Sequence, residues 1–589
     1  MRRLRPTQSE LGEVDPAALF EFKKGRTIVY EGYRDTTCLV EADEEPPHDL
    51  NQEALEIALM VSLMVGATPI DETHVMRKVV IDGSTPFGFQ RTAVVALNGE
   101  VEIGDKKVPI QTVGVEEDAC RKTKEKGETT YFRLDRLGVP LIEVVTGPVI
   151  YSPEEAEEVA LALGRILRAT GRVRRGLGTI RQDLNISIKG GAISEIKGVQ
   201  ELELVSKAVA YEVQRQLTLL KIRDELRGRG VNEEDLKGEV VDVTEIFKAT
   251  KCRVVKNAID SGGRTMAVVL PRFSGLLGME LIPRLRFGTE LSDYAKFWGR
   301  VGGIFHTDEM PAYGVSGEEV TTLREFLMVG GEDAVVFVAD REENARDALE
   351  AVVGRAKTAI AGIPNETRSS YPDGTTHYSR PRPGAARMYP ETDVPPVPIT
   401  AERLKRIRDG LPEPPEVRLT RLMKDYELNE TLAAKVLNSD YYGLFEVLAH
   451  KTRVATSFIA ATLTETLKGM EREGIEVSLL SDSLIEEVFT LVDLGVVAKE
   501  AIPDILAWMV KHEGAKLDDV VEVLGLRMIS EKELAALVER VVRENDALVK
   551  ERKLGALGPL MGILMKELRG RVDARKVSQL IEKRIREIS

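Results

Sequence analysis

Apolar and polar residues alternate over the first 230 residues in segments that switch between the strand and helix periods. Short apolar runs closed by Gly, Asn or Asp turns predict strands. Apolar residues three and four positions apart predict helices over 152–171 and about 199–222. Ser152 is the expected N-cap of the first helix, Glu155 completes a capping box, and Gly171 ends it. The predicted strands are ETHVMRKVVIDGS, QRTAVVAL, VPIQTVGVEED, VPLIEVVTGP and GTIRQDLNISIKGG.

The pattern changes after the charged, Gly-punctuated segment 223–240. Strand-like and helix-like segments alternate again over 270–355, which predicts a compact α+β unit with helices near 318–328 and 342–357. From 402 onward strand patterns vanish and amphipathic helices run to about 520. A last helical group begins at the capping box of Ser530 and Glu533.

Residues 366–399 form a segment rich in Pro, Gly, Arg and Tyr. Proline fixes φ and lacks an N–H donor, so we expect no regular element here. A linker is the usual meaning of such a composition. Arg387, Tyr389, Glu391 and Asp393 crowd together in it, however, which favours an ordered loop that forms part of a site.

Length and composition indicate a multidomain intracellular protein. A chain of 589 residues is too long for one hydrophobic core. It contains neither a signal peptide nor an apolar run of about 18 residues, so we expect no membrane span. Three widely spaced cysteines, without C-x-x-C spacing, argue against disulfides or a local zinc site. We therefore predict a cytoplasmic location.

Charge is unevenly distributed along the chain. The net charge is −14, yet segment 164–181 carries six arginines and no acid, and segment 550–589 carries eleven Lys and Arg against five acids. Two basic islands in an acidic chain indicate a polyanion held at defined places. Solvated helix faces would explain either island alone equally well.

Carboxylates stand at the ends and in the middle of predicted strands. Glu143 interrupts the apolar run LIEVV, which is typical of a strand buried on both faces, where an ionised carboxylate needs a cation or strong donors. Strand alternation places Glu116 and Asp118 on one side and Glu117 on the other. One of these three acids together with Glu143 would suit Mg²⁺. An acidic turn plus one salt-bridged glutamate is the alternative.

A polar strand face follows. Alternate residues of GTIRQDLNISI are polar, and Lys197 lies on the adjacent strand-like segment. Such a face suits a phosphate-rich substrate. A Gly-rich turn after MRKVVIDG adds further charged groups. The residues in question are Arg181, Asp183, Asn185, Ser187, Lys197, Arg77, Lys78 and Asp82.

Several common catalytic motifs are missing. The sequence has no P-loop, no G-x-G-x-x-G after a strand and no H-E-x-x-H. Cys120 follows three acids, which would raise its pKa and make it a poor nucleophile. The residues alone therefore indicate a multidomain enzyme that uses a Mg²⁺-nucleotide and has a polyanionic partner.

Five segments resemble the signature motifs of the B and E subunits of tRNA-dependent amidotransferases, in the same order and over nearly the whole chain. The segment GRVGGIFHTDEMPAYG is similar to an insertion domain shared with bacterial aspartyl-tRNA synthetases, which indicates the archaeal E branch and not the bacterial B branch. The helical tail resembles the family's tRNA-binding module. The five segments are RLDRLGVPLIEVVTGP, VEEDACRKT, GTIRQDLNISI, EIKGVQEL and RMYPETDVPP.

This resemblance implies an α+β multidomain fold: a mixed β-sheet cradle, an inserted α+β domain and all-helical C-terminal domains. The implied segments are a catalytic cradle over 1–235 that returns over 360–401, an insertion over 270–355, a helical domain over 402–520 and a tRNA-binding tail over 521–589.

The resemblance also implies an activity. ATP phosphorylates the γ-carboxylate of glutamate on tRNA(Gln), with Mg²⁺, and ammonia then displaces the phosphate. The chain shows no amide-hydrolysing signature, so ammonia would come from an asparaginase-like D subunit in a dimer of heterodimers.

The motifs carry the family's functional residues onto this chain. The implied catalytic residues are Glu117, Glu143, Arg181, Asp183 and Lys197, of which Glu117 and Glu143 bind the metal. Residues expected to bind ATP or substrate are Arg77, Lys78, Asp82, Asn185, Ser187, Arg387, Glu391 and Asp393. Residues expected to bind tRNA are Arg569, Arg571, Arg575 and Lys576.

One family motif has no counterpart. The family's first strand carries G-L-E-[IV]-H, whose Glu and His help to hold the metal, and no such segment occurs here. We therefore expect the natural protein to begin upstream of Met1 and to supply further metal ligands there.

Two other functions remain open at this point. One is a tRNA-docking subunit without catalysis, against which the clustered acids argue. The other is an adenylating enzyme related to synthetases, which would release AMP where a phosphorylating enzyme releases ADP.

Overall fold

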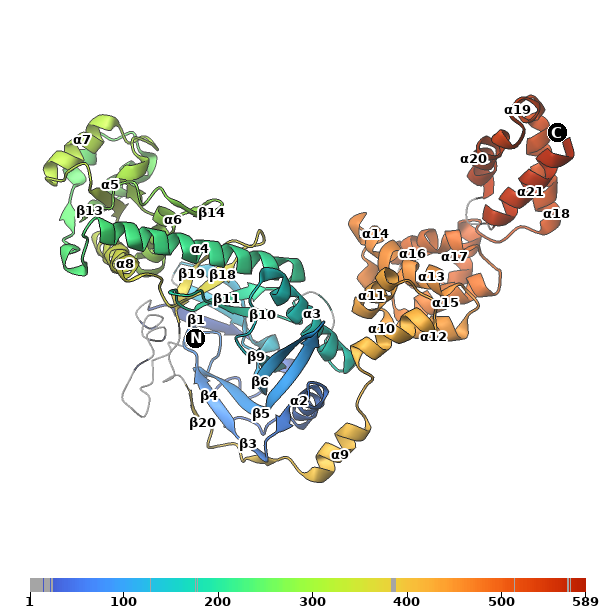
Figure 1. The fold of residues 1–589 in the computed structure, drawn as a ribbon, viewed down its shortest axis with the longest axis horizontal. Coiled ribbons are helices and arrows are strands. Elements are labelled where there is room, and N and C mark those ends of the chain that lie inside the picture. The colour runs from blue at the N-terminus through green and yellow to red at the C-terminus, as the bar shows by residue number, and fades with distance from the viewer. Residues whose placement is uncertain are drawn as a thin grey trace. The chain divides into compact units, whose positions relative to one another are not determined.

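The computed structural model describes residues 14, 18, 22, 25–127, 129–174, 176, 178–382, 388–512, 514–568, 571–572 and 574–588. It divides into two compact units, Met1–Pro412 and Glu413–Ser589 (Figure 1). Within the described ranges, no helix is long and apolar enough to cross a membrane.

A six-stranded sheet forms one half of the first unit's core. Its order is β20-β4-β5-β6-β9, with β2 beside β5. Helix α2 (Gln52–Met64) packs on one face, where Leu55 and Leu59 meet Val75, Ala93 and Val115. We call this the α2 face and the other the open face. The strands are β2 (Thr68–Pro69), β4 (Val75–Val79), β5 (Phe89–Ile103), β6 (Lys106–Glu117), β9 (Pro140–Thr146) and β20 (Met388–Pro390).

A second sheet has the order β10-β11-β18-β19. Strand β11 is parallel to β18, and the other neighbours are antiparallel. Helix α4 (Leu202–Gly228) packs on this sheet with Val205 and Ala208, next to α3 (Pro153–Ala169). The strands are β10 (Gln182–Ile186), β11 (Ser194–Val199), β18 (Glu366–Ser370) and β19 (Thr376–Pro381).

Between β11 and β18 the chain forms an α+β unit around a third sheet of order β12-β13-β17-β16. The far end of α4 enters its core through Leu219, Ile222 and Leu226. One helix therefore belongs to two hydrophobic cores. The elements are β12 (Val241–Asp242), α5 (Arg253–Asp260), β13 (Arg264–Leu270), α6 (Phe287–Gly299), β16 (Phe305–His306), α7 (Gly317–Phe326), β17 (Ala334–Asp340) and α8 (Glu342–Ala361).

Smaller elements complete the first unit. Strands β1 (Thr27–Glu31), β8 (Thr129–Arg133) and β7 (Arg121–Lys126) form one sheet. Two pairs are β3 (Glu72–Thr73) with β21 (Val397–Pro398), and β14 (Glu280–Ile282) with β15 (Leu285–Arg286). Helix α9 (Ala401–Asp409) follows β21 and contacts α2.

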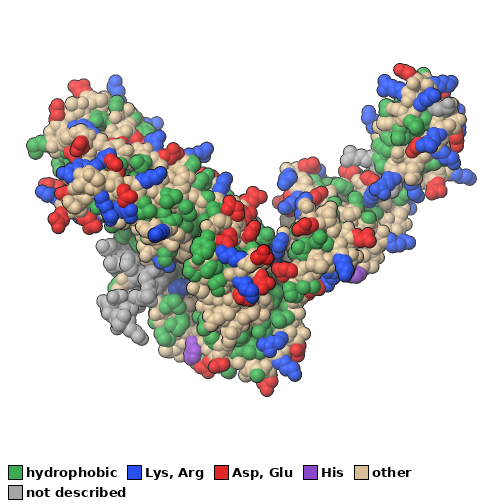
Figure 2. Space-filling view, viewed as in Figure 1, with side chains coloured by type: hydrophobic (Ala, Val, Ile, Leu, Met, Phe, Trp, Pro, Cys, Tyr) green, Lys and Arg blue, Asp and Glu red, His purple; other side chains and the backbone are tan. Residues whose placement is uncertain are grey.

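The second unit is helical and has two hydrophobic cores. The first is built by α10 (Pro415–Lys424), α11 (Glu430–Asn438), α12 (Tyr442–Lys451), α13 (Thr456–Ala461), α14 (Leu467–Arg472), α15 (Asp482–Asp493), α16 (Ile502–Lys511) and α17 (Leu517–Val523). The second is built by α18 (Glu531–Glu544), α19 (Asp546–Arg552), α20 (Leu557–Leu568) and α21 (Ala574–Ile588). Lys and Arg side chains are prominent over this second group (Figure 2).

The predicted fold class is confirmed: mixed sheets, an inserted α+β unit and helical C-terminal parts are all present. Ser152 caps α3 by accepting from the Glu155 N–H at 3.1 Å, and Ser530 with Glu533 forms the predicted capping box. The exact limits of the five predicted segments stay a prediction.

Three local predictions are wrong. Strand β9 lies at the sheet edge and none of its residues is fully buried, so the run around Glu143 is not covered on both faces. Segment 366–399 contains β18, β19, β20 and β21, because prolines can end strands or lie on sheet edges. Helix α4 continues to Gly228, six residues beyond the expected end.

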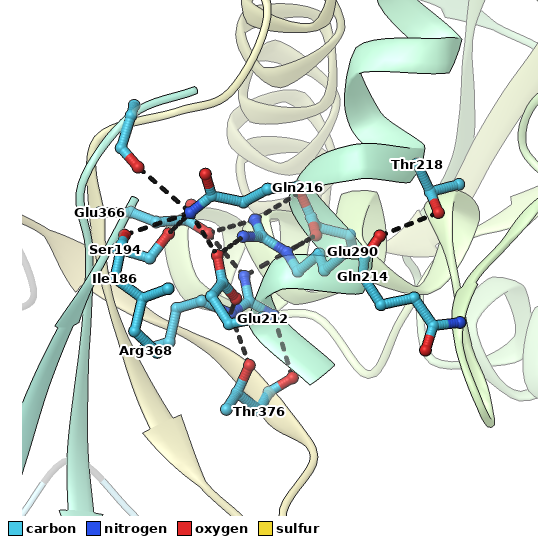
Figure 3. A network of polar contacts seen from close by, with 12 residues as sticks. Ile186, Ser194, Glu212, Gln214, Gln216, Thr218, Glu290, Glu366, Arg368 and Thr376 are labelled. Atoms are coloured by element: carbon cyan, nitrogen blue, oxygen red, sulfur yellow. Dashed lines mark hydrogen bonds and ion pairs between the residues drawn. The ribbon is translucent and has the colours of Figure 1, made fainter. Parts of the chain in front are cut away.

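A buried ion network ties the inserted unit to the second sheet (Figure 3). Arg215 on α4 pairs with Glu212, Glu290 and Glu366 at 2.8, 2.7 and 2.6 Å. Arg355 on α8 pairs with Glu290, and Arg368 on β18 pairs with Glu366, both at 2.5 Å. All six side chains are at most 1% exposed. Three cations thus balance three anions where α4, α6, α8 and β18 meet.

Removing one member of this network should destabilise the first unit strongly. Arg215→Met keeps the side-chain volume but leaves buried carboxylates unpaired, so we expect a loss of about 3–5 kcal/mol in the free energy of unfolding. The matched control is Arg346→Met, which breaks the exposed Arg346–Glu342 pair on α8 and should cost less than about 0.5 kcal/mol. Urea unfolding followed by Trp298 fluorescence in a Trp508→Phe background measures both. Equal, small losses for the two variants would contradict this account of the network.

Candidate functional site

The open face of the first sheet carries a cluster of charged side chains. In the register, Glu143 lies opposite Gly114, and Glu116 stands two residues further along the same strand β6. Residues two apart on a strand share a face, so Glu116 and Glu143 point to the same side. The Lys78 ammonium, from β4, forms an ion pair with Glu116 there.

The second sheet supplies the other half of the cluster. On β11, the Lys197 Nζ lies 2.8 Å from Asp183 Oδ2 and 3.0 Å from Glu195 Oε1. Thr367 on β18 donates its hydroxyl to Glu195 Oε2 at 2.8 Å. The charges of Lys78, Lys197 and Asp183 all act on Glu143, so the two sheets contribute to one site. We call Lys78, Glu116, Glu143, Asp183, Glu195 and Lys197 the front cluster.

The front cluster perturbs its own ionisable groups. Burial, and then the Glu116 carboxylate, raise the pKa of Glu143 above its usual value, although water reaches part of its side chain. Burial disfavours the charged form of Lys197, but Asp183 and Glu195 outweigh it and raise the pKa of Lys197. Burial is likewise outweighed at Glu195, where Lys197 and Thr367 lower the pKa. Among the described residues, Glu143 is the one carboxyl of the front cluster without an ion pair, because Lys78 pairs with Glu116 and Lys197 pairs with Asp183 and Glu195.

Glu195 contacts Lys197 in the front cluster but was not among the residues predicted from the sequence. It stands two positions before Lys197 on the same strand, so both side chains point to one face. That spacing in SEIKGV was the available signal, once Lys197 had been selected.

A second cluster lies on the α2 face. Arg77 donates to Glu391 Oε1 at 2.7 Å and to Asp393 Oδ2 at 3.1 Å, and Arg91 donates to Glu117 Oε2 at 3.0 Å. Burial alone would raise the pKa of Glu391, but the hydrogen bonds and charge of Arg77 outweigh it and hold that pKa below its usual value. These pairs join the return segment around β20 to β4 and β5.

Glu117 and Glu143 are therefore not brought together. Glu117 is adjacent to Glu116 on β6, so alternation turns its side chain to the α2 face, where Arg91 binds it. The acid that shares the face of Glu143 is Glu116 and not Glu117, while the metal-binding role of Glu117 and Glu143 stays a prediction.

The remaining predicted residues occupy several surroundings. Arg181 lies 3.3 Å from Asp118, which also binds Arg136 at 3.0 Å. Asp82 accepts from the backbone and hydroxyl of Ser84 in a turn, at 2.9 and 2.6 Å. Asn185 and Ser187 are exposed and alternate with buried or half-buried apolar residues, as predicted. Arg387 lies outside the described residues.

Cys120 is buried, and burial raises its pKa to about 12, so the thiol is unreactive as predicted. The main cause is burial, and the neighbouring acids Asp82 and Asp135 contribute less. Within the described ranges, no three His, Cys, Asp or Glu side chains are arranged to hold a metal ion by themselves.

The two basic islands differ in what the structure describes. In the first, Arg172 pairs with Glu53 at 2.8 Å. In the tail, Arg575 and Lys576 are exposed at the start of α21, and Lys576 lies 3.5 Å from Glu531. The Arg571 carbonyl accepts from the Ile529 N–H at 3.2 Å. Arg569 lies outside the described residues.

Two protein-family models match this chain, each over a different range of residues. Residues 7–405 match the GatB/GatE catalytic domain, and residues 443–585 match the GatB domain. Three similar proteins are glutamyl-tRNA(Gln) amidotransferase subunits E from archaea. The Aeropyrum pernix protein is 50% identical over all of this chain and 92% of its own length. Those of Thermococcus gammatolerans and Methanocaldococcus jannaschii are each 48% identical, over all of this chain and 93% of their own lengths.

The opposite pKa shifts of Glu143 and Glu391 predict opposite effects of pH on two neutral variants. A raised folded-state pKa means that the ionised Glu143 carboxylate costs stability, so Glu143→Gln should raise the melting temperature at neutral pH. This gain should shrink as pH falls to roughly 4, where the wild-type carboxyl is protonated. The pKa of Glu391 is lowered in the folded protein, so its ionised carboxylate stabilises the fold. Glu391→Gln should therefore lower the melting temperature at neutral pH, and that loss should fade as pH falls through the pKa of Glu391. Thermal unfolding measured from neutral pH down to roughly 4 tests both variants. Shifts of the melting temperature with the same sign would contradict the different electrostatic surroundings of Glu143 and Glu391.

Proposed function

The chain belongs to the GatB/GatE family, and we propose from this premise that it converts glutamate carried by tRNA(Gln) into glutamine. The observation that supports this most is the identity of about half of all residues, over the whole chain, with three glutamyl-tRNA(Gln) amidotransferase subunits. In the proposed reaction, the γ-carboxylate of the tRNA-bound glutamate is phosphorylated by ATP. Ammonia then displaces the phosphate.

Phosphorylation is needed because a carboxylate is a poor acylating agent. Ammonia attacking it directly would have to expel oxide, whereas phosphate leaves readily. The step brings two anions, the ATP γ-phosphate and the glutamate carboxylate, within bonding distance of each other. The site must therefore position them and offset their repulsion, mostly by electrostatics.

The front cluster has the chemistry to do this together with Mg²⁺. Its two lysines face four carboxylates, an excess of two negative charges that a divalent cation would offset. Carboxylate oxygens are the donors Mg²⁺ prefers, and it commonly takes one or two of them while substrate phosphates and water complete its shell. We assign Glu143 and Glu116 as the residues that would hold it. When bound, Mg²⁺ would neutralise phosphate charge.

The cationic residues would bind the reacting anions. Lys197 is held between Asp183 and Glu195, so its ammonium has a fixed position from which to meet a phosphate or carboxylate oxygen. Lys78 would do the same from the opposite sheet. Arg181, oriented by Asp118, adds a further donor. We assign Asn185 and Ser187, exposed beside Asp183, to substrate hydrogen bonds.

The residues of the α2 face have a different role in this proposal. Arg77, Glu391 and Asp393 bind one another and lock the return segment onto β4. Glu117 is similarly engaged by Arg91. These four predicted residues would support the sheet that carries Glu116 and Glu143, and Asp82 would shape the turn after β4.

Ammonia requires a partner, because Cys120 is buried and unreactive and no amide-hydrolysing motif occurs in the sequence. We propose an asparaginase-like D subunit as its source, assembled with this chain as a dimer of heterodimers. The exposed basic residues of α21 would bind the tRNA.

Neutralising Glu143 should abolish the phosphorylation step. In Glu143→Gln, loss of a metal ligand should lower the rate of Gln-tRNA(Gln) formation by at least about 100-fold, with tRNA binding nearly unchanged. The assay supplies Glu-tRNA(Gln), ATP, Mg²⁺ and ammonium, and follows Gln-tRNA(Gln) and ADP. Ammonium replaces the partner's contribution, so the chain's own chemistry is measured.

Two matched variants test the pairing of Glu116 with Glu143. Glu116→Gln should show a loss similar to that of Glu143→Gln, whereas Glu117→Gln should retain most activity because its partner Arg91 lies on the α2 face. Near-normal activity of Glu143→Gln at saturating Mg²⁺ would contradict the assignment of Glu143 as a metal ligand. A severe loss in Glu117→Gln alone would restore the pairing expected from the family motif.

Removing charge from the tail should weaken tRNA binding specifically. Arg575 and Lys576 are exposed on α21, while its core contacts come from Val577, Ile581 and Ile585, so changing both to Gln should leave the fold intact. We expect a higher KM for Glu-tRNA(Gln), an unchanged kcat and a salt dependence of binding reduced by up to about 0.9 per lost phosphate contact. The control removes the same charge from Lys405 and Arg408 on α9. If both double variants bind tRNA like the wild type, the tail residues are only a solvated surface.

A further inference from the structure

Arg380 on β19 is a cation beside the front cluster that has no partner of its own. Within the described part of the chain, it forms no ion pair and no hydrogen bond through its side chain. The lysines of the front cluster differ in this respect, because Lys78 pairs with Glu116 and Lys197 pairs with Glu195. Arg380 can therefore meet an anion from outside the chain without breaking an existing pair.

The strand register directs Arg380 to the face of the second sheet that carries Glu195 and Lys197. Glu195 lies opposite Thr367, and Thr367 lies opposite Arg380. Residues directly opposite each other on neighbouring strands share a face, so these three side chains form one row across β11, β18 and β19. The next row on the same face holds Lys197 and Ser369. The positive charge of Arg380 acts on Glu195, which agrees with this arrangement.

The guanidinium of Arg380 is partly shielded from water but stays reachable. Its side chain is half-buried, and only its Nε atom is shut off from water, so a ligand on this face of the sheet can contact the two Nη nitrogens. Glu195 does not serve as their partner: it forms no ion pair with Arg380, and its oxygens accept from Lys197 at 3.0 Å and from Thr367 at 2.8 Å. A charged group held partly out of water without a partner is costly, so an anion at the Nη nitrogens would offset that cost.

We propose that Arg380 binds the phosphates of ATP that are not transferred, so that the nucleotide lies across the second sheet from Lys197 towards β19. This inference rests on the proposed function and names a further substrate-binding residue of the same site. Neighbouring strands lie about 4.8 Å apart, which separates β11 from β19 by roughly 10 Å. A single carboxylate or phosphate at Lys197 is too small to span that separation, whereas a triphosphate carries anionic groups in succession. The planar guanidinium fork can bind two phosphate oxygens at once.

A phosphate of the tRNA backbone has the same recognition chemistry as a phosphate of ATP. ATP is favoured because its γ-phosphate has to reach the front cluster in the proposed reaction. The remaining phosphates are joined to it covalently, so they must lie next to that cluster, which is where the register places Arg380. The two sources differ in which substrate loses affinity when the guanidinium is removed.

The experiment measures ATP binding without tRNA, so that no phosphoryl acceptor is present. The full-length wild-type protein and Arg380→Gln are compared by equilibrium dialysis against labelled ATP with Mg²⁺. We expect the Kd for ATP to rise at least about tenfold, which is the effect of losing one hydrogen bond between charged groups. Arg380→Lys keeps the charge without the planar fork and should recover part of the affinity. Since Arg380 has no ion pair to lose, the melting temperature of Arg380→Gln should match that of the wild type.

A matched control and a second readout make the test specific. Arg346→Gln removes the same charge from an exposed position on α8 and should bind ATP like the wild type. In amidation with ammonium, Arg380→Gln should raise the KM for ATP and leave the KM for Glu-tRNA(Gln) unchanged. An unchanged Kd for ATP in Arg380→Gln, or equal weakening in Arg346→Gln, would overturn the inference. A raised KM for Glu-tRNA(Gln) with unchanged ATP binding would also overturn it, and would assign Arg380 to a phosphate of the tRNA.

Failure of this inference is distinguishable from failure of the proposed function. If the wild-type protein binds ATP and Arg380→Gln binds it equally well, only the role of Arg380 is overturned. If the wild-type protein forms no Gln-tRNA(Gln) from Glu-tRNA(Gln), ATP and ammonium, the proposed reaction is overturned, whatever its affinity for ATP.

Discussion

The alternation of side chains along a strand decides which charged groups of this protein can meet. Glu116 and Glu117 are adjacent on β6, yet one joins Lys78 and Glu143 on the open face and the other joins Arg91 on the α2 face. The register sets this arrangement, because a shift of one residue would exchange the two faces. The front cluster exists because β4, β6 and β9 hold that register and the second sheet brings Asp183 and Lys197 to the same site.

The alternation of side chains also decides which residues of the second sheet join the buried ion network. On β18, Glu366 and Arg368 belong to the network, while Thr367 between them points the other way and binds Glu195. A buried ion network is a weak source of stability but a strong geometric constraint, because any rearrangement leaves an unpaired charge in the interior. It therefore fixes the inserted unit, helix α4 and the strand beside Lys197 relative to one another, within the first unit of the chain.

Much of the fold follows from local patterns in the sequence. The caps of α3 and α18 and the strands around the acidic motifs were predictable because they depend on neighbouring residues. The burial of individual strands was not predictable. The apolar run around Glu143 belongs to an edge strand, and nothing in its sequence says how many neighbours that strand has. The strands in 366–399 were missed for the same reason, since sheet edges tolerate proline and only tertiary pairing shows where the edges are. Most residues of the candidate site could be named from residue type and motif, and their roles stay a prediction. Their grouping needed the register, which separates Glu117 from Glu143 and adds Glu195.

The central claim is that this site activates a carboxylate by phosphorylation. The most direct test supplies Glu-tRNA(Gln) whose γ-carboxylate carries ¹⁸O and follows the label during amidation with ATP and ammonium. The account predicts that one labelled oxygen passes to inorganic phosphate for each Gln-tRNA(Gln) formed, with ADP as the other product. Label in AMP, or Gln-tRNA(Gln) formed without labelled phosphate, would contradict it.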